Sequence, residues 1–194
     1  MISPFKLELK VQDSLSPKMW LLATSTLQLH SFMNDSERPH YAILSHIWGT
    51  EEISFQEIQG ARDKIKTKRG FVKVQRCCAQ AASDGFQWVW IDTCCIDKTN
   101  SAELSEAINS MYRWYGEAVK CYAYLVDMRG LLETHDDQTE RGFRRFEESR
   151  WFTRGWALQE LLAPSTVLFF NSDWVELGTR ASLHREISHW TGIP

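Results

Sequence analysis

Seven side chains have the types and positions that a reaction site needs, and they fall in three short stretches. They are Ser45, His46 and Trp48; Asp92 and Cys95; and Trp156 and Glu160. A carboxylate that is partly removed from water beside a cleft is suited to stabilising positive charge or to moving a proton. A cysteine beside a histidine could instead act as a nucleophile with its base.

Asp92 ends an apolar stretch, residues 88–91 (WVWI), that has no helical period and lies between turn residues. Such a stretch is typical of a strand buried on both faces. A charge is costly in a dry interior, so the acid that ends this strand needs a polar role. It either caps a turn or a neighbouring helix, or it belongs to a site.

Glu160 lies four residues after Trp156 and eight after Phe152, in a stretch at 149–162 that predicts one helix despite Gly155. Residues at this spacing share a helix face, and a glutamate in line with two aromatic rings does not face open water. Two interpretations follow. Glu160 is paired structurally with Arg154 or another base, or it is a partly desolvated carboxylate at the lip of a cleft.

The five cysteines include two adjacent pairs, and neither pair has the spacing of a zinc site or a disulfide framework. Cys94 or Cys95 with His46 could form a nucleophile and base, but buried cysteine is more often a packing residue. The sequence has no glycine-rich phosphate loop, no H-E-x-x-H and no G-x-S-x-G. We therefore predict no metal and no permanently bound cofactor.

The elements that must position these residues alternate along the chain. A hairpin is predicted at 20–32, strands at 41–45, 88–92, 120–127 and 166–170, and helices ending near 84 and spanning about 100–115, 149–162 and 182–190. This alternation predicts an α/β fold with a doubly wound, mostly parallel open sheet wrapped by helices, preceded by an N-terminal β-hairpin. Ligands of such sheets bind outside the carboxyl ends of the strands, where Ser45 and Asp92 are expected.

The composition is that of an ordinary soluble domain, with 43% apolar residues and a net charge of −3. It predicts no attraction to nucleic acid, no membrane span and a reducing, cytoplasmic location. A basic run at 62–76 indicates either a solvated helix face or a patch that faces phosphate or a partner. We predict a tail at 1–18 and one domain at 19–194, which is either the whole protein or a domain cut from a longer chain.

Four blocks together resemble the fungal heterokaryon-incompatibility (HET) domain. They are YAILSHIWG (41–49), WVWIDTCCID (88–97), AINSMYRWY (107–115) and RGWALQELLAP (154–164). The resemblance spans about residues 20–194 and implies an effector of self/non-self recognition and programmed cell death. In that family the domain often precedes a nucleotide-binding receptor module, which would be a C-terminal partner here.

The HET family is in turn distantly similar to Toll/interleukin-1 receptor (TIR) domains, some of which cleave NAD and are often inactive as monomers. Ser149, Trp151 and Glu160 resemble the helix that carries the TIR glutamate, although the spacing differs and Trp156 replaces a cysteine. The resemblance implies NAD as substrate and Glu160 as the catalytic carboxylate.

The other expected contacts with NAD come from the same strand ends. Trp48 or Trp156 would stack on a ring of the substrate. Asp92 would hold ribose hydroxyls, and Ser45, His46 and Cys95 would line the pocket.

The sequence therefore leaves three functions open. The first is a death effector, activated by self-assembly, that hydrolyses NAD through Glu160. The second is a non-catalytic interaction module that acts by oligomerisation, and the third is a cysteine-dependent hydrolase.

Overall fold

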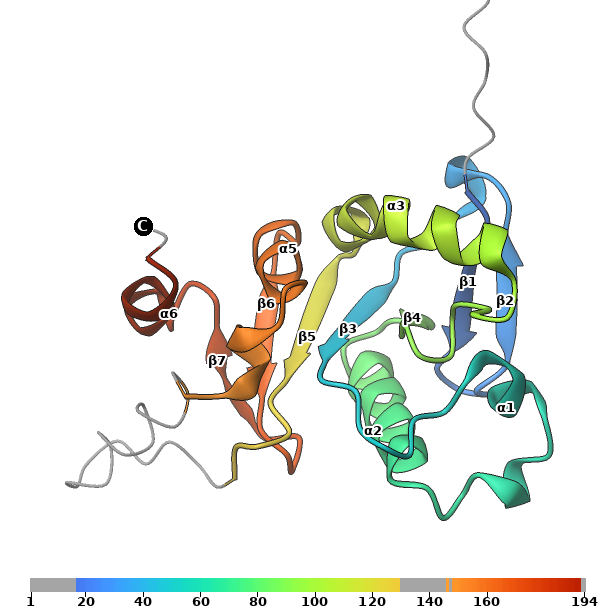
Figure 1. The fold of residues 1–194 in the computed structure, drawn as a ribbon, viewed down its shortest axis with the longest axis horizontal. Coiled ribbons are helices and arrows are strands. Elements are labelled where there is room, and N and C mark those ends of the chain that lie inside the picture. Colours follow the sequence, from blue (N-terminus) through green and yellow to red (C-terminus); the bar gives the residue numbers. More distant parts are fainter. Residues whose placement is uncertain (1–16, 130–145, 147, 193–194) are drawn as a thin grey trace, which may run out of the picture.

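The computed structural model describes residues 17–129, 146 and 148–192, and within them one seven-stranded sheet carries the fold (Figure 1). The strand order is β2-β1-β4-β3-β5-β6-β7. The four central strands β4, β3, β5 and β6 are parallel, and the strands on either side are antiparallel. The predicted α/β class, with a mostly parallel sheet and an N-terminal hairpin, is confirmed.

The bounds of the elements agree with most of the expected ranges. The strands are β1 (Met19–Ala23), β2 (Leu29–Phe32), β3 (Ala42–His46), β4 (Trp88–Trp90), β5 (Lys120–Tyr124), β6 (Val167–Phe170) and β7 (Glu176–Thr179). The α-helices are α1 (Phe55–Gln59), α2 (Arg69–Ser83), α3 (Ser101–Glu117), α5 (Ala157–Leu162) and α6 (His184–Thr191). The described ranges also contain three 3-10 helices, which are η1 (Asp35–Glu37), η2 (Arg62–Lys64) and η3 (Arg150–Thr153).

Local sequence signals explain where the helices begin. Ser54 and Glu57 form a capping box at the start of α1. Asn100 caps α3 by accepting hydrogen bonds from the backbone N–H groups of Ala102 and Glu103. These caps satisfy N–H groups that the first turn leaves unpaired, which fixes the loops that follow β3 and β4.

The helices lie on both faces of the sheet (Figure 1). Helix α2 covers one face, and α3 and α5 lie together on the other. The chain moves from β3 to β4 in one direction along the sheet and from β5 to β6 in the other, so the connections after β3 and β5 diverge. In doubly wound sheets this divergence opens a crevice at the carboxyl ends of the two strands.

One expectation about the elements is wrong, and one strand was not predicted. The single helix predicted at 149–162 is two pieces, η3 and α5, separated at Arg154–Trp156 where Gly155 interrupts the helical pattern. Strand β7 was not predicted, because Glu176–Thr179 has neither apolar continuity nor clear alternation. The predicted tail at 1–18 lies mostly outside the described residues.

Candidate functional site

The Glu160 carboxylate is buried at the carboxyl end of β3, on the face of the sheet covered by α3 and α5. The Ser45 hydroxyl donates a hydrogen bond to it. Arg154 holds both of its oxygens, with Nη1–Oε2 and Nη2–Oε1 distances of 2.8 and 3.0 Å. The indole N–H of Trp151 donates to Ser45 Oγ at 2.7 Å. Because 1% of Glu160 is exposed, water does not compete with these contacts.

This arrangement corrects the expected position of Glu160. The carboxylate is not at the lip of a cleft, because the Arg154 guanidinium covers it. Trp156 does not share its face, because α5 begins only after Trp156, whose side chain is exposed. The alternative of a structural pair between Glu160 and Arg154 describes the closed arrangement correctly.

A second buried network lies at the same strand ends and faces α2. His46 Nε2 is 2.8 Å from Asp92 Oδ1, and His46 Nδ1 is 2.6 Å from Lys73 Nζ. Lys73 also donates to Glu52 Oε1 at 2.5 Å, and the Trp48 indole donates to Asp92 Oδ2 at 2.7 Å. Side chains alternate between the faces of a strand, so Ser45 and His46, adjacent on β3, belong to separate networks.

Every polar atom of the imidazole is satisfied when His46 is neutral and carries its proton on Nε2. Nδ1 then accepts from the Lys73 ammonium, and Nε2–H donates to Asp92. Burial lowers the pKa of Lys73, and Glu52 and Asp92 offset part of that shift. Burial alone would raise the pKa of Asp92, but its contacts with His46, Lys98 and Trp48 outweigh this, and the pKa lies below its usual value.

The cysteines do not form the expected reactive pair with His46. Cys95 is buried, its Sγ donates weakly to the Val89 carbonyl, and both ring nitrogens of His46 are engaged elsewhere. The hydrogen bond with Cys95, together with burial, raises the pKa of Cys94 well above its usual value. Both thiols lie in the packed hydrophobic core, and the expected place of Cys95 in a substrate pocket stays a prediction.

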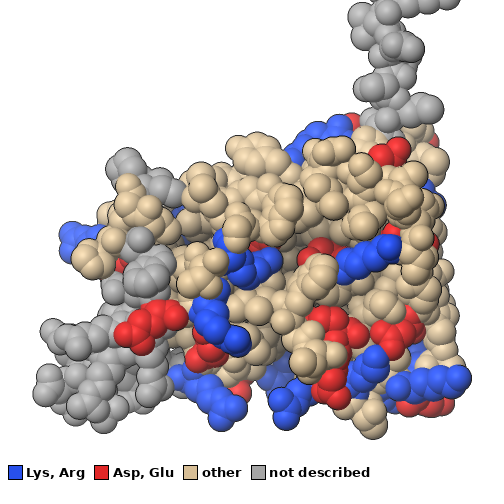
Figure 2. Space-filling model, in the orientation of Figure 1, with Lys and Arg blue, Asp and Glu red and all other residues tan. Residues whose placement is uncertain are grey.

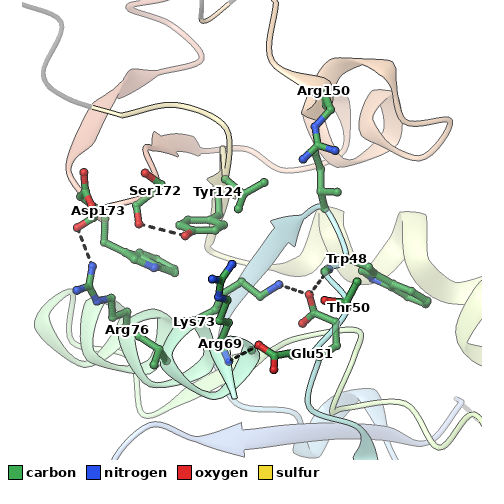
Figure 3. A pocket seen from close by; sticks show the side chains of 17 residues that line it. Trp48, Thr50, Glu51, Arg69, Lys73, Arg76, Tyr124, Arg150, Ser172 and Asp173 are labelled. Carbon is green, nitrogen blue, oxygen red and sulfur yellow. Dashed lines mark hydrogen bonds and ion pairs between the residues drawn. The ribbon is translucent and has the colours of Figure 1, made fainter. Parts of the chain in front are cut away.

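A cleft of about 450 Å³ opens where the connections after β3 and β5 diverge (Figure 3). Its walls come from residues 47–52, the first half of α2, the end of β5 and residues 172–174. Trp48 is the only one of the seven predicted site residues in this lining. Arg69, Lys73 and Arg76, which also line it, belong to the basic run for which a phosphate-facing role was one alternative.

The structure thus separates the predicted site into parts. Ser45 and Glu160 meet on one face, and His46, Trp48 and Asp92 meet at the strand ends beside α2. The prediction missed Lys73, because sequence shows a basic run but not which of its members turns inward. In the described part of the chain, no three His, Cys, Asp or Glu side chains gather as a metal site requires.

The geometry defines a doubly wound α/β domain with buried polar networks and a cleft at the carboxyl ends of its parallel strands. Comparison with known proteins places the domain more narrowly. Residues 41–131 match the family described as heterokaryon incompatibility protein (HET). This chain belongs to the HET family.

A curated relative supports the same assignment. The chain is 48% identical over 159 residues to vegetative incompatibility protein HET-E-1 of Podospora anserina. The match covers 80% of this chain and 11% of that relative's length. No solved structure matches the chain. No helix in the described ranges has the length and apolar character needed to cross a bilayer.

Proposed function

We propose that this domain is a cytoplasmic cell-death effector of vegetative incompatibility and that it hydrolyses NAD to nicotinamide and ADP-ribose, with Glu160 as the catalytic carboxylate. The name of the Podospora relative supports the biological process. The environment of Glu160 supports the chemistry: a buried carboxylate holds a planar cation with both oxygens. Such a site is suited to a substrate that becomes a planar cation as it reacts.

The proposed reaction needs little besides that carboxylate. The nicotinamide of NAD is already cationic, so the bond from its nitrogen to ribose breaks with the electron pair passing to nitrogen. Nicotinamide then leaves as a neutral molecule. The ribose acquires oxocarbenium character, which a nearby carboxylate stabilises. Water adds to the same ribose carbon and releases its proton, which gives ADP-ribose.

The closed arrangement requires an opening step before substrate can reach Glu160. The Arg154 side chain is 20% exposed and the Glu160 side chain 2%, so the guanidinium forms the outer cover of the carboxylate. In the proposed mechanism, self-association displaces Arg154 and the ribose of NAD takes its place. Ser45 keeps its hydrogen bond and orients the carboxylate, as a positioning residue.

The test is nicotinamide release by protein that is forced to oligomerise through a fused assembly tag. We expect release by the wild type and by Glu106→Gln, a control on an exposed position of α3. Glu160→Gln should release nicotinamide at least about 100-fold more slowly, because the amide carries no charge to stabilise the ribose cation. Thermal unfolding verifies that both variants fold. Equal rates for the wild type and Glu160→Gln would remove Glu160 from the mechanism.

A second candidate function is a non-catalytic module that signals by association. Its support is the outer surface of α3 and α5, where Ile108, Tyr112, Leu158 and Leu162 are between 43% and 61% exposed. The part of the surface over these two helices carries few charged side chains (Figure 2). Large exposed apolar side chains on adjoining helices are typical of interaction surfaces.

One substitution separates the two functions. Leu158→Asp places a charge on this surface and should prevent association of untagged protein, measured by light scattering. If association is the whole activity, the tagged wild type assembles and releases no nicotinamide. If the domain is an enzyme, the fused assembly tag restores nicotinamide release to Leu158→Asp.

A further inference from the structure

The cleft between α2 and the ends of β3 and β5 has features that neither the family assignment nor the Glu160 network explains. Arg69 and Arg76 lie seven residues apart on α2, which is about two helical turns, and both line the cleft. Arg150 lines it from η3, on the opposite side. Figure 3 shows these three side chains around the opening, with Lys73 between them.

The positive charges of the cleft are only partly neutralised by neighbouring acids. Lys73 is paired with Glu52, and Arg150 Nε is 3.7 Å from Asp127 Oδ2. The Arg76 guanidinium donates to the backbone carbonyl of Asp173 at 3.1 Å, and no carboxylate of the described residues pairs with it. A guanidinium that holds only a neutral carbonyl retains donors for an anion.

The Arg69 guanidinium likewise has no carboxylate partner among the described residues. The acid nearest to its backbone is Glu51, whose carboxylate accepts the Arg69 N–H at 3.4 Å. Glu51 also lines the cleft, so it opposes the entry of an anion there. Glu51→Gln removes this charge and keeps the shape of the side chain, so it tests whether the carboxylate opposes an anion in the cleft.

One wall of the cleft is aromatic. The rings of Tyr124 and Trp174 are stacked, with centroids 5.1 Å apart and planes at 25°. Trp174 has a φ of +62°, a backbone conformation that bulky residues rarely adopt. The Asn171 side chain holds this turn by accepting hydrogen bonds from the backbone N–H groups of Asp173 and Val175.

Three polar atoms of the lining residues are removed from solvent and have no hydrogen-bond partner in the described part of the chain. They are Glu52 Oε2, Ser172 Oγ and Trp174 Nε1. An unpaired polar atom in such a position costs free energy, and most such atoms in proteins are satisfied. Two of the three can donate a hydrogen bond, which suits a ligand rich in acceptors.

We propose that this cleft is a binding site for a nucleoside diphosphate, whose phosphates pair with Arg69 and Arg76 and whose base lies against the wall of Tyr124 and Trp174. Guanidinium groups bind phosphate oxygens in a bidentate manner, and aromatic rings stack on nucleobases. Glu160 and its partners Ser45 and Arg154 do not line this cleft. Binding there therefore does not depend on whether the domain cleaves NAD.

The test is calorimetric titration of the whole chain with ADP, adenosine and inorganic pyrophosphate, with tryptophan fluorescence as a second readout. We expect ADP to bind at least about tenfold more tightly than either fragment, because each fragment lacks one half of the contacts. Arg69→Ala/Arg76→Ala should weaken ADP binding about 100-fold. Glu51→Gln should strengthen ADP binding, because it removes an opposing charge.

Two variants serve as controls. Lys64→Ala removes a basic residue of η2 outside the cleft lining and should change ADP affinity less than about twofold. Glu160→Gln should bind ADP as the wild type does, whatever its effect on NAD. The proposal is overturned if ADP fails to bind at about 1 mM or if the double arginine variant binds it normally. Pyrophosphate binding as tightly as ADP would overturn the role of the aromatic wall.

Discussion

Removing the Arg154 side chain should destabilise the domain strongly, because it leaves the Glu160 carboxylate buried without its counterion. Arg154→Met keeps much of the side-chain volume and loses both charge-assisted contacts, at 2.8 and 3.0 Å. Breaking a buried ion pair by removing one partner costs about 3–5 kcal/mol. The Arg154 side chain is 20% exposed, so water can reach the vacated space, and we expect a loss of about 3 kcal/mol in the free energy of unfolding.

The double variant Arg154→Met/Glu160→Gln provides the matched control. It removes the unpaired charge but keeps an acceptor for the Ser45 hydroxyl, so we expect it to lose only about 1 kcal/mol relative to wild type. Urea unfolding followed by circular dichroism measures both values, and the single variant should melt roughly 6–12 °C lower. A loss below about 1 kcal/mol for Arg154→Met, or a double variant less stable than the single one, would refute this reasoning.

Two further predictions concern the networks beside α2. The lowered pKa of Asp92 means that its ionised form stabilises the fold above the unfolded pKa of about 3.9, and that this contribution is lost as pH falls through the lower folded value. Asp92→Asn should therefore cost about 1–3 kcal/mol at pH 7, and urea titrations should show the difference from wild type narrowing below about pH 4. Gly70→Ala should destabilise the domain by about 1–3 kcal/mol, because its Cβ would lie 2.3 Å from the Glu51 carbonyl oxygen. Gly155→Ala, whose Cβ would meet nothing within 4 Å, should change stability by less than about 0.5 kcal/mol, and equal melting temperatures for the two alanine variants would contradict the close approach.

The central strands could be predicted from sequence because both faces of each are buried. Residues 41–44 (YAIL) and 88–91 (WVWI) are continuous apolar stretches, and a parallel strand between helical layers requires that pattern. The order of the elements then limits the topology, since parallel connections are right-handed and cross the sheet with a helix. The buried position of Asp92 after β4 follows from the same argument.

The details of the site could not be predicted, because they depend on where each helix begins. One residue of slip rotates a helix by about 100°, so the break at Gly155 places Trp156 outside while Glu160 turns inward. Ile108 of α3 is 43% exposed, although Met111 and Tyr115 at helical spacing from it are buried. The contact between Lys73 and His46 joins residues 27 positions apart and has no signal in either local pattern.

The NAD content of fungal cells after induced expression of the domain tests the proposed activity most directly. With the wild type, we expect NAD to fall before growth stops and nicotinamide to accumulate. With Glu160→Gln at equal protein level, both NAD and growth should be maintained. Growth arrest by the wild type at constant NAD, or equal NAD loss with Glu160→Gln, would contradict the proposal that this domain kills by cleaving NAD through Glu160.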